Sequence, residues 1–262
     1  MSKKLKVVTY NLWCCYAVRN NQNAFVHRIG LIYDKIKKEQ PDIIAFQEVV
    51  AQQLEVLEKL FPEYAFYGQG RLENFDGEGL YVAVKKSELM LCGLDIFWIS
   101  PQPYVPATRF EAQSEYPRIC IDLLLRHKET GKMLRVYDVH LDHIESEAKA
   151  QGMQVVLEKI AEDKKKMPAE IILLGDFNEI PTGPAITYIN ECKDETLVDI
   201  TASIPVSYHG FSDPNAECKI DYIFTSENLA AHVESVEIWN SKLNNIHLSD
   251  HYPISAVIDL EA

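Results

Sequence analysis

The sequence predicts an α+β fold in which two packed mixed β-sheets are flanked by helices. Two observations lead to this expectation: strand-like apolar runs outnumber helical segments, and the helices fall at similar places in each half of the chain. The chain has 262 residues, is 47% apolar, and contains no Gly/Ser linker, repeat or low-complexity tract. We therefore expect a single domain that covers residues 1–262.

The first part of the chain predicts a strand–helix–strand–helix order. Residues 6–10 form an apolar strand, and residues 43–46 form a short apolar run typical of a strand that is covered on both faces. Between them, apolar residues spaced four, three and four apart predict a helix that ends before Pro41: Phe25, Ile29, Ile32 and Ile36. Leu54, Leu57 and Phe61 mark a second helix, which ends at Pro62.

The rest of the chain is richer in strands. We expect strands at 80–84, 94–99, 119–125, 134–140, 171–174, 220–225, 233–239 and 254–260. A long helix is expected over 145–166 and a short one over 184–192. The long helix ends in Lys164-Lys165-Lys166, which suits a solvated last turn near the negative end of the helix dipole; a nucleic-acid contact is the alternative. Residues 100–117 contain four prolines and predict a long irregular loop.

The charge balance narrows the set of partners. The formal net charge is −13, with 26 Lys and Arg against 39 Asp and Glu. This balance argues against a protein that holds long nucleic acid non-specifically, since such proteins replace phosphate counterions with Lys and Arg. It leaves open a short nucleic-acid end, a nucleotide or a small phosphoester. The sequence does not indicate an oligomeric state.

The sequence also indicates a cellular location. No stretch approaches the roughly 20 apolar residues of a membrane span, so no membrane partner is expected. Met1-Ser2-Lys3-Lys4 leads into a strand without a signal-like apolar run. The six cysteines contain no Cys-x-x-Cys pair, and several lie in apolar runs. We therefore expect a cytoplasmic protein with reduced thiols.

Short polar clusters occur where four of the apolar runs end or begin. They are Asn11, Gln47-Glu48, Asp176-Phe177-Asn178 and Ser249-Asp250-His251. A single cluster of this kind is an ordinary loop. Four at the same kind of position predict one shared site, built to hold a metal ion or a phosphate.

Two of these clusters contain carboxylates suited to such a site. Glu48 closes an apolar strand and fits a ligand for Mg²⁺, which is usually held by one or two carboxylates together with water and substrate oxygens; an ordinary surface carboxylate is the alternative. In an extended segment, Asp176 and Asn178 point the same way, so Asp176 can activate a water while Asn178 donates to a phosphate oxygen. The alternative for this pair is an Asx turn.

Histidines supply the remaining candidate chemistry. His140 and His251 can donate to a phosphate oxygen and stabilise developing charge, although a lone histidine is more often structural. Asp221 stands inside an apolar strand and needs a partner, and orienting an imidazole is a natural role for it. Glu78, which precedes the strand at 80–84, can do the same for the other histidine.

Taken together, these polar motifs resemble those of a known enzyme superfamily. An ordered set that spans almost the whole chain resembles the endonuclease/exonuclease/phosphatase superfamily: Tyr10-Asn11, Gln47-Glu48, His140-Leu141-Asp142-His143, Gly175-Asp176-Phe177-Asn178, Ile220-Asp221-Tyr222-Ile223-Phe224 and Ser249-Asp250-His251. The chain looks most similar to the bacterial branch related to the deadenylases. The resemblance implies a four-layer α/β/β/α sandwich and metal-dependent cleavage of phosphoester bonds, with Mg²⁺ or alternatively Mn²⁺.

The resemblance also implies a role for each matched residue. Glu48 is the metal ligand, with Asn11 and Asp250 close by in the metal or phosphate shell. Asp176 positions the attacking water and Asn178 contacts the phosphate. His140 and His251 bind and polarise the phosphate, with Glu78 and Asp221 as their carboxylate partners. Arg118 matches a basic position that commonly faces the phosphate.

Departures from the family pattern leave the substrate open. Abasic-site repair members carry Gln-Glu-Thr-Lys at the metal strand, whereas Val49 follows Glu48 here. The arginine-rich replacement of inositol-polyphosphate phosphatases is absent around Asp221, and Lys219 stands where arginine is common. The signal peptide and membrane-inserting aromatics of secreted sphingomyelinases are absent as well. The expected substrate is a nucleic-acid end, a nucleotide or a small phosphodiester or phosphomonoester, with a phosphoinositide-type substrate as the alternative.

Two other function classes are weighed against hydrolysis. An inactive phosphate-binding module of the same fold is disfavoured because every matched catalytic position is occupied. A thiol-dependent enzyme using Cys14 or Cys15 lacks a visible activating arrangement. We expect the loops at 68–79, 100–117 and 203–218 to set specificity. Trp98, Tyr104 and Phe110 either stack on a base or sugar or pack beneath the long loop.

Overall fold

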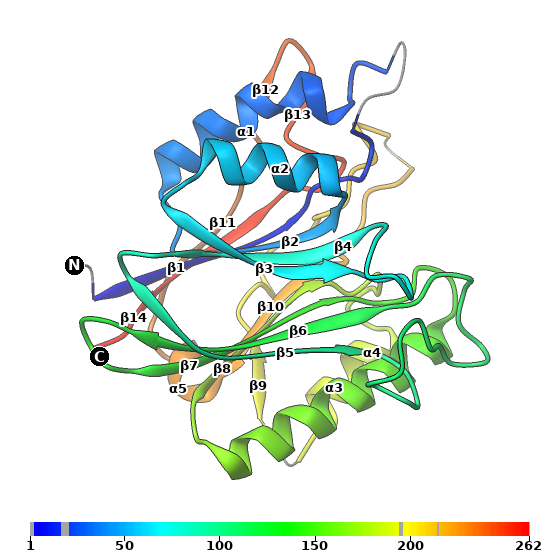
Figure 1. Cartoon of the computed structure of the whole chain (residues 1–262), viewed down its shortest axis with the longest axis vertical. Helices are drawn as coiled ribbons and strands as arrows, with labels where there is room; N and C mark the ends of the chain where they lie inside the picture. Colours follow the sequence, from blue (N-terminus) through cyan, green and yellow to red (C-terminus); the bar gives the residue numbers. More distant parts are fainter. Residues whose placement is uncertain (1–2, 17–20, 194–195, 214, 262) are drawn as a thin grey trace.

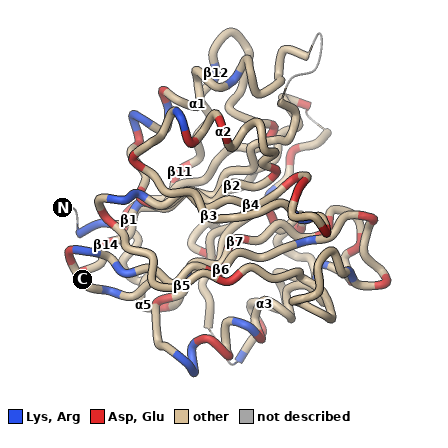
Figure 2. Tube along the Cα trace, in the orientation of Figure 1, with Lys and Arg blue, Asp and Glu red and all other residues tan. Residues whose placement is uncertain are grey.

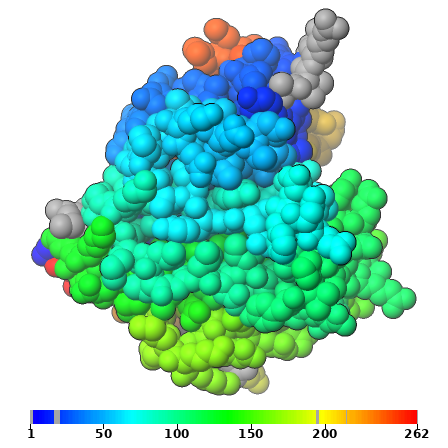
Figure 3. Space-filling view, in the orientation of Figure 1, coloured from blue at the N-terminus to red at the C-terminus, as the bar shows by residue number. Residues whose placement is uncertain are grey.

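Two six-stranded sheets pack face to face, and helices cover the outer face of each (Figure 1). The computed structural model describes residues 3–16, 21–193, 196–213 and 215–261, so residues 1 and 2 of the expected start and residue 214 of the 203–218 loop lie outside the described part. The four layers confirm the α+β sandwich expected from the sequence. In Figure 3, the blue and cyan part of the chain lies above the green part along a broad boundary.

The first sheet has the strand order β11-β14-β1-β2-β4-β3 and carries the first two helices. Its strands are β1 (Lys4–Asn11), β2 (Ile43–Val49), β3 (Tyr64–Gly70), β4 (Gly79–Lys85), β11 (Val233–Ile238) and β14 (Ile254–Asp259). Helices α1 (Phe25–Glu39) and α2 (Ala51–Leu60) lie on its outer face (Figure 1). Strands β1 and β2 are parallel, and the other neighbours are antiparallel.

The second sheet has the order β5-β6-β7-β8-β10-β9. Its strands are β5 (Leu89–Trp98), β6 (Ile119–His127), β7 (Met133–His140), β8 (Glu170–Asp176), β9 (Leu197–Asp199) and β10 (Asp221–Ser226). Helices α3 (Ser146–Lys166) and α4 (Pro184–Glu191) cover its outer face (Figure 1). The remaining elements are α5 (Glu227–Ala230), β12 (Lys242–Leu243) and β13 (Ile246–His247).

Apolar residues fill three layers. One cluster lies between the sheets, and one lies beneath the helices on each side. Strands near the middle of the sandwich are buried on both faces, as β8 shows with Ile171, Ile172, Leu173 and Leu174 each at most 1% exposed. This burial explains why β2 and β8 are continuous apolar runs in the sequence rather than alternating ones.

The order of the strands places the functional clusters at one edge of the sandwich. Each sheet contains one parallel pair, β1 with β2 and β7 with β8. In register, Asn11 lies opposite Gln47, and His140 lies opposite Asp176. Because parallel strands end at the same edge of their sheet, each pair presents two polar strand ends side by side.

Some elements differ from those expected. Strands β3, β9, β12 and β13 and helix α5 were not predicted, because Tyr64–Gly70 has no clear apolar alternation and the other elements are very short. Strand β5 begins at Leu89 rather than at residue 94, since a register shift between Leu91 and Gly93 interrupts its pattern. Residues 99–118 form neither helix nor strand, as expected for the loop at 100–117.

Gly175 allows β8 to approach β7 closely just before the functional loop. Its φ is 140°, and a Cβ built on it would lie 2.0 Å from the carbonyl oxygen of Val139. We expect Gly175→Ala to lower the free energy of unfolding by about 3 kcal/mol or more, because strain and backbone overlap add together. Denaturant unfolding measures the change.

A matched glycine serves as the control for this prediction. Gly30 lies in helix α1, and nothing lies within 4 Å of a Cβ built on it. Gly30→Ala should leave stability unchanged or raise it by about 0.5–1 kcal/mol. Equal stability of the two alanine variants would contradict the close approach at Gly175.

Candidate active site

A polar cavity of about 370 Å³ opens at the edge where the two parallel pairs end. Its lining comes from both sheets and from the loops between them: Trp13, Glu48, Arg71, Glu78, Tyr116, Arg118, His140, His143, Asp176, Asn178, Tyr208, Ile220, Asp250 and His251. Eight of the ten residues singled out from the sequence line this cavity. The other two, Asn11 and Asp221, lie behind it, and each is hydrogen-bonded to a lining residue.

Glu48 reaches the cavity through an irregularity in its strand. The register of β2 against β4 shifts between Phe46 and Val49, and Glu48 has a φ of 60°. A bulge of this kind changes the direction of a side chain, and a left-handed non-glycine residue is strained. The Glu48 carboxylate accepts hydrogen bonds from Asn11 Nδ2 at 3.1 Å and from the Cys14 backbone N–H at 3.2 Å. Sequence reasoning located Glu48 but had no signal for the bulge.

Asn11 links the two sheets. Its Nδ2 donates to Glu48 Oε1 at 3.1 Å and to Asp176 Oδ2 at 2.9 Å. Its Oδ1 accepts the backbone N–H of Trp13 at 3.0 Å. Asn11 thus holds two carboxylates from different sheets side by side. Direct contact of Asn11 with a metal or a phosphate stays a prediction.

Asp176 lies at the centre of this network. Its Oδ1 accepts the backbone N–H of Asn178 at 2.8 Å, so the Asx-type turn that was the structural alternative is present within the site itself. His140 Nε2 lies 3.6 Å and His251 Nε2 lies 3.8 Å from Asp176 Oδ2. Burial, followed by the charge of Asp221, raises the pKa of Asp176 to about 7. In this environment the carboxyl group has the proton affinity of a general base.

Asn178 is held from two sides. Its φ is 48°, and its Nδ2 donates to the carbonyl oxygen of Leu141 at 3.1 Å. The buried Lys149 of α3 donates from Nζ to the Asn178 carbonyl oxygen at 2.9 Å and lies 3.7 Å from Glu179. Sequence reasoning did not identify Lys149, because a lysine inside a long amphipathic helix gives no functional signal.

The two histidines have opposite electrostatic environments. His251 Nδ1 donates to Asp221 Oδ2 at 2.8 Å, the contact expected from the sequence. Burial opposes protonation of His251, but Asp221 and Asp176 outweigh it and raise its pKa well above the ordinary value. Burial, together with Arg118, lowers the pKa of His140 well below that value. His251 is therefore suited to act as a cation and His140 as a neutral imidazole.

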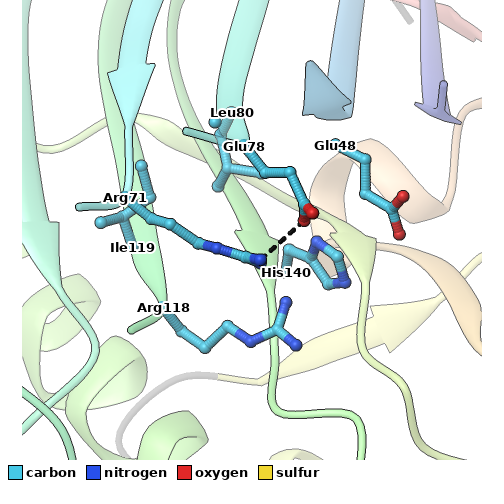
Figure 4. Close-up of a pocket in the computed structure, with 8 residues that line it drawn as sticks. Glu48, Arg71, Glu78, Leu80, Arg118, Ile119 and His140 are labelled. Carbon is cyan, nitrogen blue, oxygen red and sulfur yellow. Dashed lines mark ion pairs between the residues drawn. The ribbon is translucent and has the colours of Figure 1, made fainter. Parts of the chain in front are cut away.

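Glu78 has a different partner from the one expected. It was expected to orient His140, but its Oε2 accepts from Arg71 Nη2 at 2.7 Å (Figure 4). Arg71 follows β3 and lines the cavity together with Glu78. Sequence reasoning missed Arg71 because it stands in the 68–79 loop, where no motif surrounds it. Glu78 thus acts on the arginine, and the neighbouring carboxylate of His140 is Asp176.

Trp98, Tyr104 and Phe110, for which stacking on a substrate and packing in the protein were both open, are not in the lining of this cavity. Trp98 is buried, and its Nε1 donates to the Arg71 carbonyl oxygen at 2.9 Å. Tyr104 is 63% exposed and donates to Asp95, and Phe110 packs against the core beneath α3. The aromatic side chains that line the cavity are Trp13, Tyr116 and Tyr208. Of these, Tyr116 and Tyr208 come from the 100–117 and 203–218 loops.

Arg28 of α1 supports the site from behind. It is fully buried and donates to the carbonyl oxygens of Leu12 and Leu248 at 2.9 and 2.5 Å. These carbonyls adjoin the Asn11 and Ser249-Asp250-His251 clusters. The Arg28 guanidinium also lies 5.6 Å from the Trp13 ring centre. One buried cation thus joins two loops that are far apart in the sequence.

Cys14 is not activated as a nucleophile. Burial, followed by the charges of Glu48 and Glu78, raises the pKa of its thiol. A thiol nucleophile needs the opposite shift, toward the thiolate. The environment of Cys14 therefore opposes a thiol-dependent reaction at this site.

Several ligand atoms converge tightly enough to hold a divalent ion. One ligand atom from each of Glu48, His140 and Asp176 lies within 4.8 Å of the others. Burial raises the pKa of Glu48, and the charges of Asp250 and Glu78 raise it further. Crowded, desolvated carboxylates of this kind are stabilised by a bound cation.

Comparisons with known proteins agree with this geometry. Residues 8–251 match the model of the endonuclease/exonuclease/phosphatase family. The chain belongs to this family. An uncharacterised protein of Acanthamoeba polyphaga mimivirus is 25% identical over 248 residues, which cover 89% of this chain and 91% of that protein. The family expected from the motifs is confirmed.

Solved structures of the family share the whole fold. An endonuclease/exonuclease/phosphatase from Bacteroides vulgatus is 25% identical, with a TM-score of 0.89 over 98% of this chain and 99% of that one. A mannosyl-6-phosphatase of Bacteroides thetaiotaomicron is 26% identical, with a TM-score of 0.82 over 96% of this chain and 98% of that one.

Among the described residues, no helix is both long and apolar enough to cross a membrane.

Proposed function

We propose that this protein is a metal-dependent hydrolase that cleaves the phosphoester bond of a small phosphorylated molecule. Hydrolysis of phosphoester bonds is the activity of its family. The observation that carries the proposal is the convergence of Glu48, His140 and Asp176 from both sheets on one polar cavity. Groups with strongly shifted pKa values that line one cavity are typical of catalytic sites, and the pKa values of Asp176 and His251 are raised while that of His140 is lowered.

The residues present fit a divalent cation of the Mg²⁺ or Mn²⁺ type. Glu48 would hold it, with His140 and Asp176 as the ligand groups that converge on the same position and Asp250 as a further carboxylate in the lining of the cavity. A cation bound there supplies charge neutralisation for the phosphate and for the leaving oxygen. Oxygen ligands of this kind suit hard ions.

The protein side chains account for the remaining chemistry. The oxygen of a water molecule attacks phosphorus, and Asp176 accepts the proton that the water loses. The ester P–O bond breaks, and the alcohol oxygen leaves with the bonding electrons and takes a proton from solvent. The imidazolium of His251, held by Asp221, donates to a non-bridging oxygen. Asn178 has one amide N–H left for the phosphate beyond its bond to Leu141.

A small substrate is supported by the cavity and the charge of the protein. The volume of the cavity, about 370 Å³, lies near the lower end of the range typical of small-molecule sites. The net charge of −13 disfavours long nucleic acid, and in Figure 2 basic segments are scattered rather than gathered into one stripe. A relative named as a mannosyl-6-phosphatase supports the same choice.

A cytoplasmic location is part of the proposal, supported by six cysteines that are all unpaired.

Removal of the metal tests the proposal. Purified protein should hydrolyse p-nitrophenyl phosphate or bis-p-nitrophenyl phosphate with Mg²⁺ or Mn²⁺. Excess EDTA should lower the rate at least about a hundredfold, and added metal should restore it. Single-stranded oligonucleotides and soluble phosphoinositides, assayed in parallel, test the alternative substrates. Binding of phosphate without hydrolysis of any ester would identify an inactive module instead.

A further inference from the structure

Arg118 is a buried cation with unused donors that borders the cavity. Its side chain comes from the residue before β6 and is 4% exposed. Its Nη2 donates to His143 Nδ1 at 3.1 Å. Its Nε and Nη1 are buried and have no hydrogen-bond partner among the described residues. Within the same described part of the chain, no carboxylate forms an ion pair with it.

A second arginine stands beside Arg118. Arg71 is 7% exposed, is paired with Glu78 at 2.7 Å, and has its guanidinium 4.7 Å from the ring centre of Tyr116. Figure 4 shows the guanidinium groups of Arg71 and Arg118 near His140, with the Glu48 carboxylate on the other side of that imidazole. Both arginines line the cavity that contains the candidate metal ligands.

The two arginines differ in their ion pairing. Glu78 forms an ion pair with Arg71, whereas no carboxylate of the described residues lies within ion-pair distance of Arg118, and Asp142, Asp176 and Glu48 act on its charge only from farther away. Burial and the nearby Arg71 lower the pKa of Arg118 to about 10, so that it is still a cation at neutral pH. An unsatisfied buried donor costs about 1–3 kcal/mol, and more when it is charged. Buried polar groups of native proteins are satisfied by protein, water or a bound ligand, and a ligand in the adjoining cavity can supply acceptors for Nε and Nη1 of Arg118.

The unpartnered donors of Arg118 fit a phosphate ligand. A guanidinium presents a planar fork of N–H donors that matches the terminal oxygens of a phosphate. A phosphomonoester carries a charge of about −1.5 to −2 at neutral pH, whereas a phosphodiester carries one negative charge. In a diester, moreover, a second ester oxygen with its substituent replaces one of the terminal oxygens that Arg118 could bind.

We propose that Arg118, placed beside the Arg71–Glu78 pair, binds a terminal oxygen of a phosphomonoester dianion and thereby selects monoesters over diesters. The inference rests on the proposed phosphoesterase function and narrows its substrate to phosphomonoesters. Arg71 forms the adjoining wall, where Glu78 and Tyr116 fix its position and the pair adds no net charge.

The test compares two substrates that differ in one ester group. The values of kcat/KM for p-nitrophenyl phosphate and bis-p-nitrophenyl phosphate are measured with Mg²⁺ for the unaltered protein and for Arg118→Met. The unaltered protein should prefer the monoester. Arg118→Met should lower kcat/KM for the monoester about 100- to 1,000-fold and for the diester less than about fivefold.

Two further variants make the result interpretable. Arg126→Met is the matched control, since Arg126 is an exposed arginine near the far end of β6, the strand that Arg118 precedes. It should change neither rate more than about twofold. Arg118→Lys keeps the charge without the planar fork and should show a loss of about tenfold that is confined to the monoester. It also replaces Arg118→Met if that variant does not fold.

Binding supplies a readout that does not depend on turnover. Inorganic phosphate should raise the melting temperature of the unaltered protein, and the phosphate concentration required should increase at least about tenfold in Arg118→Met. Dimethyl phosphate, which has a single charge, should bind both proteins equally.

The outcomes separate the two proposals. If the unaltered protein hydrolyses neither ester with Mg²⁺ or Mn²⁺, the phosphoesterase function is wrong. If it hydrolyses them but Arg118→Met or Arg118→Lys lowers both rates by the same factor, the selection by charge is wrong and the phosphoesterase function stands. A preference of the unaltered protein for the diester overturns the inference in the same way.

Discussion

Replacing Asp176 with asparagine is expected to lower kcat by between about a hundredfold and ten thousandfold, the range that a positioned general base contributes. Asp176 is the carboxylate on which Asn11, Asn178 and both active-site histidines converge. Its raised pKa gives it the affinity for a proton that an attacking water must lose. An asparagine side chain has almost the same shape but cannot accept that proton. The effect should therefore fall on the chemical step.

Steady-state kinetics with the substrate found in the ester panel measures this loss. Circular dichroism and thermal unfolding should show a folded protein, since the change removes a buried charge and keeps the side-chain volume. Asp95→Asn is a suitable control, because Asp95 belongs to the same sheet but contacts Tyr104 and Lys159. A folded Asp176→Asn variant with near-normal kcat would show that another group activates the water.

Most of the site could be predicted because its residues stand at strand ends. Asn11, Glu48 and Asp176 each lie at or near the end of a buried apolar strand, where the change from apolar to polar is easy to see in the sequence. The parallel pairing of β1 with β2 and of β7 with β8 then brings these ends to one edge. The order of the motifs and their positions at strand ends were therefore sufficient to predict these three site residues.

The residues that loops contribute to the cavity could not be predicted from the sequence. Arg71 and Trp13 reach the cavity only because the chain folds back, and no pattern surrounds either residue. The prediction that Glu78 orients His140 was wrong for the same reason. Whether Glu78 reaches Arg71 or His140 depends on the path of the 68–79 loop. The sequence left open whether Trp98 stacks on a substrate or packs in the protein, and its contact with Arg71 of that loop shows that it is packed and buried.

The supporting role of Arg28 could not be predicted because it depends on contacts between distant parts of the chain. Arg28 stands on the helical face that periodicity predicts to be buried, yet it is a cation satisfied by backbone carbonyls of Leu12 and Leu248. A pattern of apolar residues does not reveal which backbone groups lack partners. Such a residue becomes visible only when the backbone hydrogen bonds of distant loops are accounted for.

The position of the site follows from the architecture. Each sheet alone provides two adjacent polar strand ends, which is too few donors for a metal, a water and a phosphate together. Packing the sheets face to face doubles that number, and Asn11 ties the halves together by donating to Glu48 of one sheet and Asp176 of the other. The site therefore depends on correct packing of the sandwich.

Replacing Asp221 with asparagine is expected to lower kcat about a thousandfold or more while KM changes little. The 2.8 Å contact with Asp221 Oδ2 fixes the ring of His251 with its Nδ1 protonated, and the nearby carboxylates keep that ring positively charged despite its burial. An asparagine offers no negative charge, and it can turn an N–H toward the ring and so favour the other tautomer. When a carboxylate that orients a catalytic histidine is lost in this way, the rate falls by up to about ten thousandfold with little change in geometry.

Two measurements and a control variant distinguish this positioning role from a structural one. Thermal unfolding should show that the Asp221→Asn variant is folded, and titration with Mn²⁺ should show that metal binding is retained, since Asp221 lies behind the cavity rather than in its lining. Asp213→Asn, at an exposed loop residue, should leave kcat unchanged. If Asp221→Asn retains normal turnover, or loses activity only through a raised KM, then His251 does not act in the chemical step as a cation held by this carboxylate.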